Sequence, residues 1–200
     1  MQPTQIWLGI GLAGAMLVAS PPSVGAAETC VEGGKIATVA EFSDGSTVRV
    51  LERMSDTLRY EVSGSKIGPS TVVVKNGFFT LTSETSAGKN TFVWQGDAEK
   101  TAPLKEGEKL RASAVIKRGD GAEANVDAEI AVGAREVLTI DGCPYPTVQV
   151  TVVNTVKGAK SMVLRSYHEK SMLTLRTVVF RFLASGEPEA VATYTAVSVK

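Results

Sequence analysis

Histidine and cysteine are scarce in this chain: its 200 residues include one histidine, His168, and two cysteines, Cys30 and Cys143. Zinc sites typically need three or four cysteine, histidine or carboxylate ligands at recurrent spacings, so we predict no metal site. A catalytic triad needs a base and an acid that orients it. The nearest acid, Glu169, follows His168 directly, and adjacent residues on a strand point to opposite faces. We therefore predict no catalytic residues, no metal ligands and no cofactor.

The chain also lacks an excess of either charge, because Lys plus Arg and Asp plus Glu each total 21. No cluster of basic residues interrupts this balance. Nucleic-acid affinity rests mainly on Lys and Arg contacts to phosphates. We therefore predict no nucleic-acid partner.

Long apolar runs are missing except for one near the N-terminus, Ile6–Ala19, which is 14 residues long. A transmembrane helix needs about 20 residues, whereas the apolar region of a signal peptide has about 7 to 15. Two prolines and a run of small residues follow it. We predict a signal peptide over residues 1–26, cleaved after Ala26 or Ala27; a retained anchor is the alternative. The mature chain then has no transmembrane segment.

The predicted export of the chain determines how the two cysteines are interpreted. An even number of cysteines in an exported chain most often forms disulfides, so we predict a bond between Cys30 and Cys143. The pair lies 113 positions apart, and closing a loop of that length stabilises a fold by about 4 to 5 kcal/mol in the chain-entropy model. We expect residues 27–200 to form one domain in the periplasm, with secretion as the alternative.

Strand-forming segments fill the rest of the chain. The clearest is a hairpin over Thr71–Lys75 and Phe78–Thr82, because Asn76-Gly77 between them suits a type I′ turn. Further strands are predicted over 46–54, 57–63, 90–94, 109–117, 122–132, 135–140, 147–156, 161–167, 172–183 and 190–199.

The strand pattern predicts an all-β fold of about ten antiparallel strands after the N-terminal signal helix. It forms either a sandwich or a curved, barrel-like sheet. One short helical turn fits within Ala98–Glu108. The apolar alternation changes parity near Thr177-Val178, which indicates a bulge or a strand crossing.

Aromatic residues make up only 6% of the chain, and most of them fall on or beside predicted strands. Such side chains usually anchor a core. They also line apolar cavities in curved sheets, where a lipid-like molecule can bind. The residues predicted to line such a cavity are Phe79, Phe92, Trp94, Tyr167, Phe180 and Phe182.

Four motifs within residues 94–177 resemble a group of uncharacterised, exported bacterial β-rich proteins. They are Trp94, then PLKEGEKL (103–110), VLTIDGCPYPTVQV (137–150) and RSYHEKSMLTLRT (165–177). The resemblance implies an exported, periplasmic, antiparallel β domain, and it brings no known active site to this chain.

The sequence therefore favours an exported, non-enzymatic β domain that acts as a binding or envelope-associated structural protein. A lipid-like or small amphipathic molecule is the most concrete ligand. The first alternative is an envelope assembly or adhesion component that acts through protein–protein contacts along exposed strand edges. The second is a small hydrolase that uses His168, which needs a serine, cysteine or carboxylate within reach of that ring.

Overall fold

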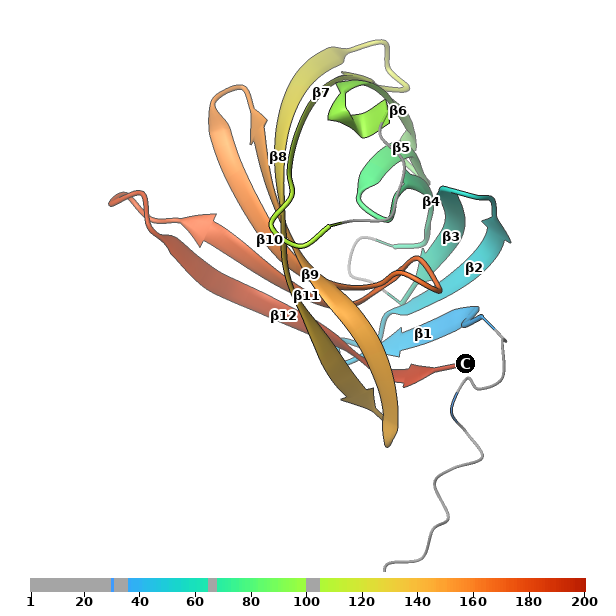
Figure 1. Ribbon diagram of the computed structural model, residues 1–200. Coiled ribbons are helices and arrows are strands. Elements are labelled where there is room, and N and C mark those ends of the chain that lie inside the picture. The colour runs from blue at the N-terminus through green and yellow to red at the C-terminus, as the bar shows by residue number, and fades with distance from the viewer. Residues whose placement is uncertain (1–29, 31–35, 65–67, 100–104) are drawn as a thin grey trace, which may run out of the picture.

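Twelve antiparallel strands close into a single barrel in the computed structural model, which describes residue 30 and residues 36–64, 68–99 and 105–200 (Figure 1). Each strand pairs with its neighbours in the chain, and β1 pairs with β12 to close the ring. The strands are β1 (Val39–Phe42), β2 (Thr47–Arg53), β3 (Thr57–Ser63), β4 (Ser70–Lys75), β5 (Phe79–Thr85), β6 (Gly88–Gly96), β7 (Lys109–Lys117), β8 (Glu123–Ile140), β9 (Cys143–Val156), β10 (Ala159–His168), β11 (Leu173–Phe182) and β12 (Pro188–Val199). A 3-10 turn, η1 (Asp97–Glu99), follows β6.

The barrel confirms the predicted all-β fold and decides between a sandwich and a barrel. Two details differ from the prediction. β1 was missed, because a four-residue strand carries little periodic signal. The predicted segments 122–132 and 135–140 form one continuous strand, β8, interrupted only by a register shift between Val132 and Arg135. The predicted signal peptide and the domain boundary at residue 26 lie outside the described residues.

The interior of the barrel follows from the alternation of apolar residues along β7, β8 and β9. Partners in an antiparallel pair share a face of the sheet, and the buried residues Leu110, Ile130 and Val152 lie in register across these strands. Polar residues such as Arg111 and Glu129 occupy the opposite face, where they form an exposed ion pair at 3.5 Å. One face therefore packs the core and the other meets water.

The register shift between Val132 and Arg135 has a structural consequence, because it exchanges the two faces of the long β8–β9 hairpin. Beyond the shift, Leu138 and Tyr145 form a cross-strand pair and pack in a second core cluster with residues of β1 and β11. Figure 1 shows this hairpin extending beyond the other strands at the end where the C-terminus lies. The barrel thus has one core cluster inside it and another that spreads under the hairpin.

The parity change near Thr177-Val178 has counterparts on both sides of β11. Between β10 and β11 the register shifts at Leu175, and between β11 and β12 it shifts between Val179 and Phe180. The predicted bulge is therefore present as two irregularities that bracket the expected position.

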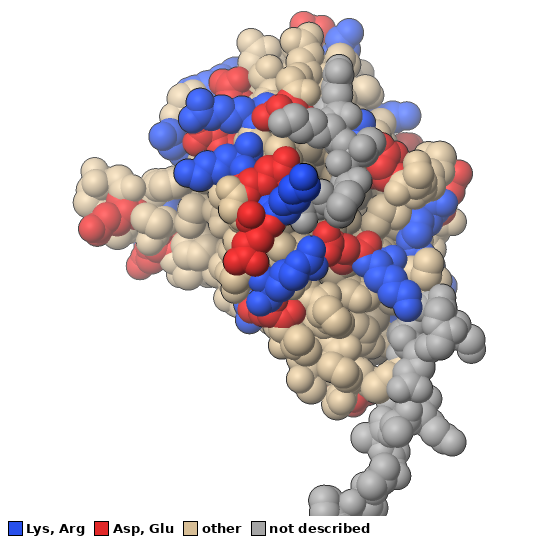
Figure 2. Space-filling model, in the orientation of Figure 1, with Lys and Arg blue, Asp and Glu red and all other residues tan. Residues whose placement is uncertain are grey.

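Acidic and basic side chains are interspersed on the face of the molecule drawn in Figure 2, in keeping with the formal neutrality of the chain. Within the described ranges, no helix has the length and apolar character needed to cross a membrane. The same residues contain no group of three or more His, Cys, Asp or Glu side chains placed to hold a metal ion.

Candidate functional site

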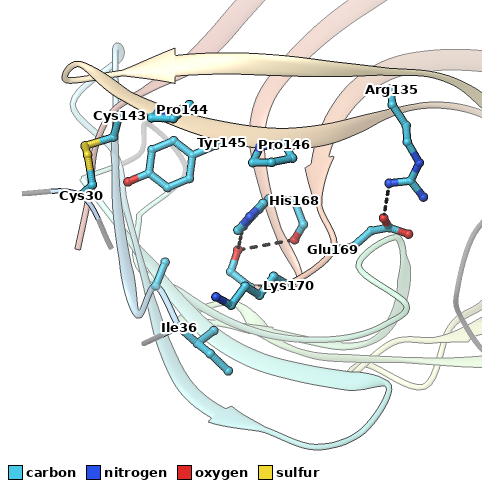
Figure 3. Close-up of a pocket in the computed structure, with 12 residues that line it drawn as sticks. Cys30, Ile36, Arg135, Cys143, Pro144, Tyr145, Pro146, His168, Glu169 and Lys170 are labelled. Atoms are coloured by element: carbon cyan, nitrogen blue, oxygen red, sulfur yellow. Dashed lines mark hydrogen bonds and ion pairs between the residues drawn. A yellow bond between two sulfur atoms is a disulfide. The ribbon is translucent and has the colours of Figure 1, made fainter. Parts of the chain in front are cut away.

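A pocket with a volume of about 490 Å³ lies beside the predicted disulfide (Figure 3). It forms where the β8–β9 hairpin, the β10–β11 turn and the segment before β1 meet. Its lining residues are Cys30, Ile36, Ala37, Arg135, Cys143, Pro144, Tyr145, Pro146, His168, Glu169, Lys170 and Ser171. We call it the His168 pocket.

Cys30 and Cys143 form a disulfide, with a Cα–Cα distance of 5.3 Å. Cys143 is buried at the start of β9, and Cys30 packs against the second core cluster. The bond thereby ties a segment that precedes β1 to the tip of the β8–β9 hairpin. A bond in this position fits a chain that folds in an oxidising compartment.

His168 lies within reach of a hydroxyl group, which the hydrolase alternative requires: its Nδ1 is 2.8 Å from Oγ of Ser171. Other features of the contact favour a structural role. Ser171 lines the His168 pocket but has no exposed surface. Among the described residues no carboxylate hydrogen-bonds to the ring, and Glu169 pairs instead with Arg135 at 2.6 Å. The hydroxyl also donates to the carbonyl of His168 at 3.5 Å, which is typical of a turn.

The surroundings of the His168 ring disfavour its charged form. Burial lowers the pKa of His168 and nearby Lys170 lowers it further, while Glu169 opposes these effects. The ring of Tyr145 meets it edge-on, with centroids 5.7 Å apart. His168 is therefore a neutral, packed side chain at physiological pH.

A second polar cluster lies on the outer face of the sheet, centred on Glu136 of β8. Its carboxylate accepts hydrogen bonds from Ser166 at 2.5 Å, from Gln149 at 3.1 Å and from Arg176 at 2.9 and 3.1 Å. Burial raises the pKa of Glu136, but the bonds from Ser166, Gln149 and Arg176 outweigh that effect, and the pKa lies below its usual value. These bonds join β8, β9, β10 and β11 across one face.

The barrel interior contains a cavity of about 220 Å³ lined by three of the predicted aromatic residues, Phe79, Phe92 and Trp94. Their rings pack together: Phe79 and Trp94 meet edge-on at 5.1 Å, and Phe92 stacks on Trp94 at 6.4 Å. We call this the aromatic cavity. A barrel of eight strands has an interior just wide enough for side chains or one small ligand, and width grows with strand number. Ala128 of β8, a small residue, also lines the cavity. Twelve strands and this small residue together leave space.

The sheet is split next to the aromatic cavity. β5 and β6 pair only from Thr82↔Thr91 to Thr85↔Gly88 and diverge beyond that point. Trp94 bridges the divergence, because its indole Nε1 donates to the carbonyl of Thr80 at 2.6 Å. The Trp94 side chain thus connects β5 and β6 where the two strands make no main-chain pairs.

The other predicted aromatic residues lie elsewhere. Tyr167 is buried in the same core cluster and meets Phe78 edge-on at 6.4 Å, but it does not line the aromatic cavity. Phe180 pairs with Met162, one residue from the pair Val163↔Val179 that shares a face with the core residue Val152. Phe180 and Phe182 therefore lie on the outer face of β11. The structure brings three of the six residues together around one cavity.

Sequence reasoning missed Arg165, an arginine inside the barrel. It pairs with Val150, which has no exposed surface, and with Thr177. Its Nη1 donates to the carbonyl of Gly77 at 3.2 Å. The sequence did indicate that Arg165 faces inward, because Val163, Arg165 and Tyr167 lie two residues apart and share one face of β10. The other two of these residues are apolar.

No known protein-family profile matches the sequence, and no curated protein matches it. Among solved structures, the chain is similar to the hypothetical lipoprotein YmcC from Escherichia coli. The two share 10% sequence identity with a TM-score of 0.47, over 81% of this chain and 86% of the other. YmcC is itself described only as a hypothetical lipoprotein.

Proposed function

We propose that this protein is an exported, non-enzymatic binding protein of the periplasm that holds a small amphipathic molecule inside its barrel. The observation that supports the proposal is the aromatic cavity, a space beside a split in the wall that aromatic and aliphatic side chains line together with polar residues such as Asn154 and Arg165. Apolar cavities with a few well-placed polar groups are the usual sites for small ligands. The disulfide between Cys30 and Cys143 is in keeping with export. Secretion beyond the envelope is the alternative location.

Native mass spectrometry of the full-length gene product, expressed in its host and purified without detergent, tests the proposal. We expect an added mass that leaves on solvent extraction, and we expect the extracted protein to regain it from an amphiphile in solution. A matched variant, Ala128→Leu, places a larger side chain into the cavity wall and should reduce the bound fraction. Ligand-free protein that takes up no amphiphile after extraction would overturn the proposal.

Assembly through exposed strand edges remains the alternative, but the fold gives it little support. Such pairing needs a long strand with free main-chain groups. Within the described strands, β1 pairs with β12 through residues such as Ala40 and Val199, so the first and last strands protect one another. Cross-linking in the intact envelope checks this alternative, which predicts a defined partner.

A further inference from the structure

Arg165 lies on the inner face of β10 and is partly exposed, and among the described residues no Asp or Glu forms an ion pair with it. The one hydrogen bond that these residues give its side chain is to the carbonyl of Gly77. A guanidinium group carries five N–H donors. Burying a charge without a counter-charge is costly. The fold thus holds a partly exposed cation on its inner face, and the described residues give its side chain one hydrogen bond and no counter-charge.

The position of Arg165 shows which cavities its remaining N–H donors can reach. Its side chain borders two spaces: the aromatic cavity, and a second cavity of about 180 Å³ lined by residues such as Leu58, Tyr60 and Met172. The residue is partly exposed, and it lines both spaces. The guanidinium therefore stands where the two cavities approach each other.

Arg53, a second partly buried arginine, shows what a structural role looks like in this fold. Arg53 donates through Nη2 to the carbonyls of Ala37 at 3.0 Å and Ser171 at 2.8 Å. It thereby fastens the segment before β1 to the β10–β11 turn. Arg165 makes one longer hydrogen bond and lines two cavities, so the contacts of the two arginines differ.

We propose that the barrel binds an anionic amphiphile whose carboxylate or phosphate headgroup pairs with Arg165 and whose apolar chain lies in the aromatic cavity. Arginine suits this task, because its planar fork binds either headgroup through two parallel hydrogen bonds. Phe79, Phe92 and Trp94 supply apolar contacts for the chain. The assignment rests on the proposed binding function and names its ligand class.

Tyr60 is a further group available to the headgroup. It lines the second cavity together with Arg165. Burial raises the pKa of Tyr60, and the charge of Arg165 opposes that rise without cancelling it. The phenol is therefore protonated at neutral pH and available to donate a hydrogen bond to an anion.

Fluorescence titration of Trp94 tests the assignment. The sequence has two tryptophans, Trp7 and Trp94, so a Trp7→Phe background leaves Trp94 as the only one. The delipidated protein is titrated, below the micelle concentrations, with dodecanoate, dodecyl phosphate, dodecanol and dodecyltrimethylammonium. We expect the two anions to bind about 10- to 100-fold more tightly than dodecanol, as hydrogen bonds to a charged group imply. Comparison of the two anions distinguishes a carboxylate ligand from a phosphate ligand.

Two variants locate the effect. Arg165→Gln should lose the preference for the anions over dodecanol. Arg176→Gln is the matched control, because Arg176 lies on the outer face and pairs with Glu136; it should keep the preference. If the wild type binds dodecanol and the anions with equal affinity, the Arg165 assignment is overturned but the binding function is not. This comparison uses the wild type alone, so it holds even if Arg165→Gln fails to fold. Absence of binding by all four probes would overturn both.

Discussion

The ring of Tyr167 occupies the place where a side chain at residue 77 would begin: a Cβ built on Gly77 would lie 2.1 Å from Cε2 of Tyr167. Gly77 belongs to the β4–β5 turn, in which Asn76 and Gly77 have φ angles of 53° and 78°. The turn is buried, unlike most hairpin turns, and Tyr167 and Arg165 of β10 contact it across the barrel. Glycine is therefore required here both for its backbone conformation and for space.

Gly77→Ala should destabilise the protein more than the same substitution in an equivalent exposed turn. Gly158, in the β9–β10 turn, has a φ angle of 82°, and no neighbouring atom lies within 4 Å of the place that a Cβ would take there. Gly158→Ala thus measures the backbone strain alone, about 1 kcal/mol. Gly77→Ala adds the displacement of Tyr167, about 1 to 3 kcal/mol more. Urea unfolding of both variants checks the difference, and equal losses would mean that Tyr167 moves aside without cost.

This turn also shows where sequence-based prediction succeeds and where it ends. The pair Asn76-Gly77 between β-branched and aromatic residues predicts the hairpin, because the turn chemistry is local. Its burial depends on Tyr167 and Arg165, which lie about 90 positions further along the chain, and no local pattern encodes that contact. Closure of the barrel through β1 and β12 is likewise a long-range event.

The candidate site could likewise be predicted only in part. Phe79, Phe92 and Trp94 share a cavity because β5 and β6 are neighbours in sequence and in space. Phe180 and Phe182 lie on the outer face, because register shifts on both sides of β11 change which residues face inward. The sequence indicates the irregularity in β11, but it does not show which residues on either side of it face the interior of the barrel.

The disulfide should contribute strongly to stability. Cys143→Ala opens a loop closed over a sequence separation of 113, and the chain-entropy model gives a loss of up to about 5 kcal/mol. Cys30→Ala should cost a similar amount, and the double variant should cost little more than either single variant, because all three lack the same bond. Thermal unfolding measures these losses. Additive losses would show that the cysteines act independently, and two freely alkylated thiols in unreduced protein from the host would contradict the pairing.

Glu136 should make the fold sensitive to acid. Its pKa is lower in the folded than in the unfolded chain, so its stabilising effect is present above the ordinary value of 4.5 and is lost as the pH falls through the folded-state value. Glu136→Gln should cost about 1 to 3 kcal/mol at pH 7, and the gap to the wild type should narrow below the ordinary value of 4.5. Chemical unfolding at a series of pH values gives both quantities.

Glu189→Gln is the matched control for Glu136. Glu189 pairs with Arg181 at 2.6 Å, but both side chains are largely exposed, and such pairs contribute about 0 to 1 kcal/mol. A loss at Glu189 as large as that at Glu136 would contradict the importance assigned to the buried network.

His168 should add a separate pH effect at a higher range. Burial lowers its pKa in the folded chain, so the unfolded chain takes up a proton first, near the ordinary value of 6.5. The free energy of unfolding should therefore decrease as the pH falls from about 7 through 6.5, and His168→Gln should flatten that segment of the profile. Chemical unfolding of both proteins across this range checks the effect, and parallel profiles would contradict it.

Ser171→Ala distinguishes a structural from a catalytic role for the hydrogen bond between Oγ of Ser171 and Nδ1 of His168. The variant removes that bond, and we expect a decrease of about 1 kcal/mol in the free energy of unfolding. We also expect ester hydrolysis by the wild type to remain at background, since Ser171 is fully buried and no carboxylate among the described residues orients the ring. The opposite outcome is that the wild type hydrolyses p-nitrophenyl esters and that both Ser171→Ala and His168→Gln abolish this activity. That outcome would establish an enzyme, because removing a purely structural hydrogen bond leaves background hydrolysis unchanged.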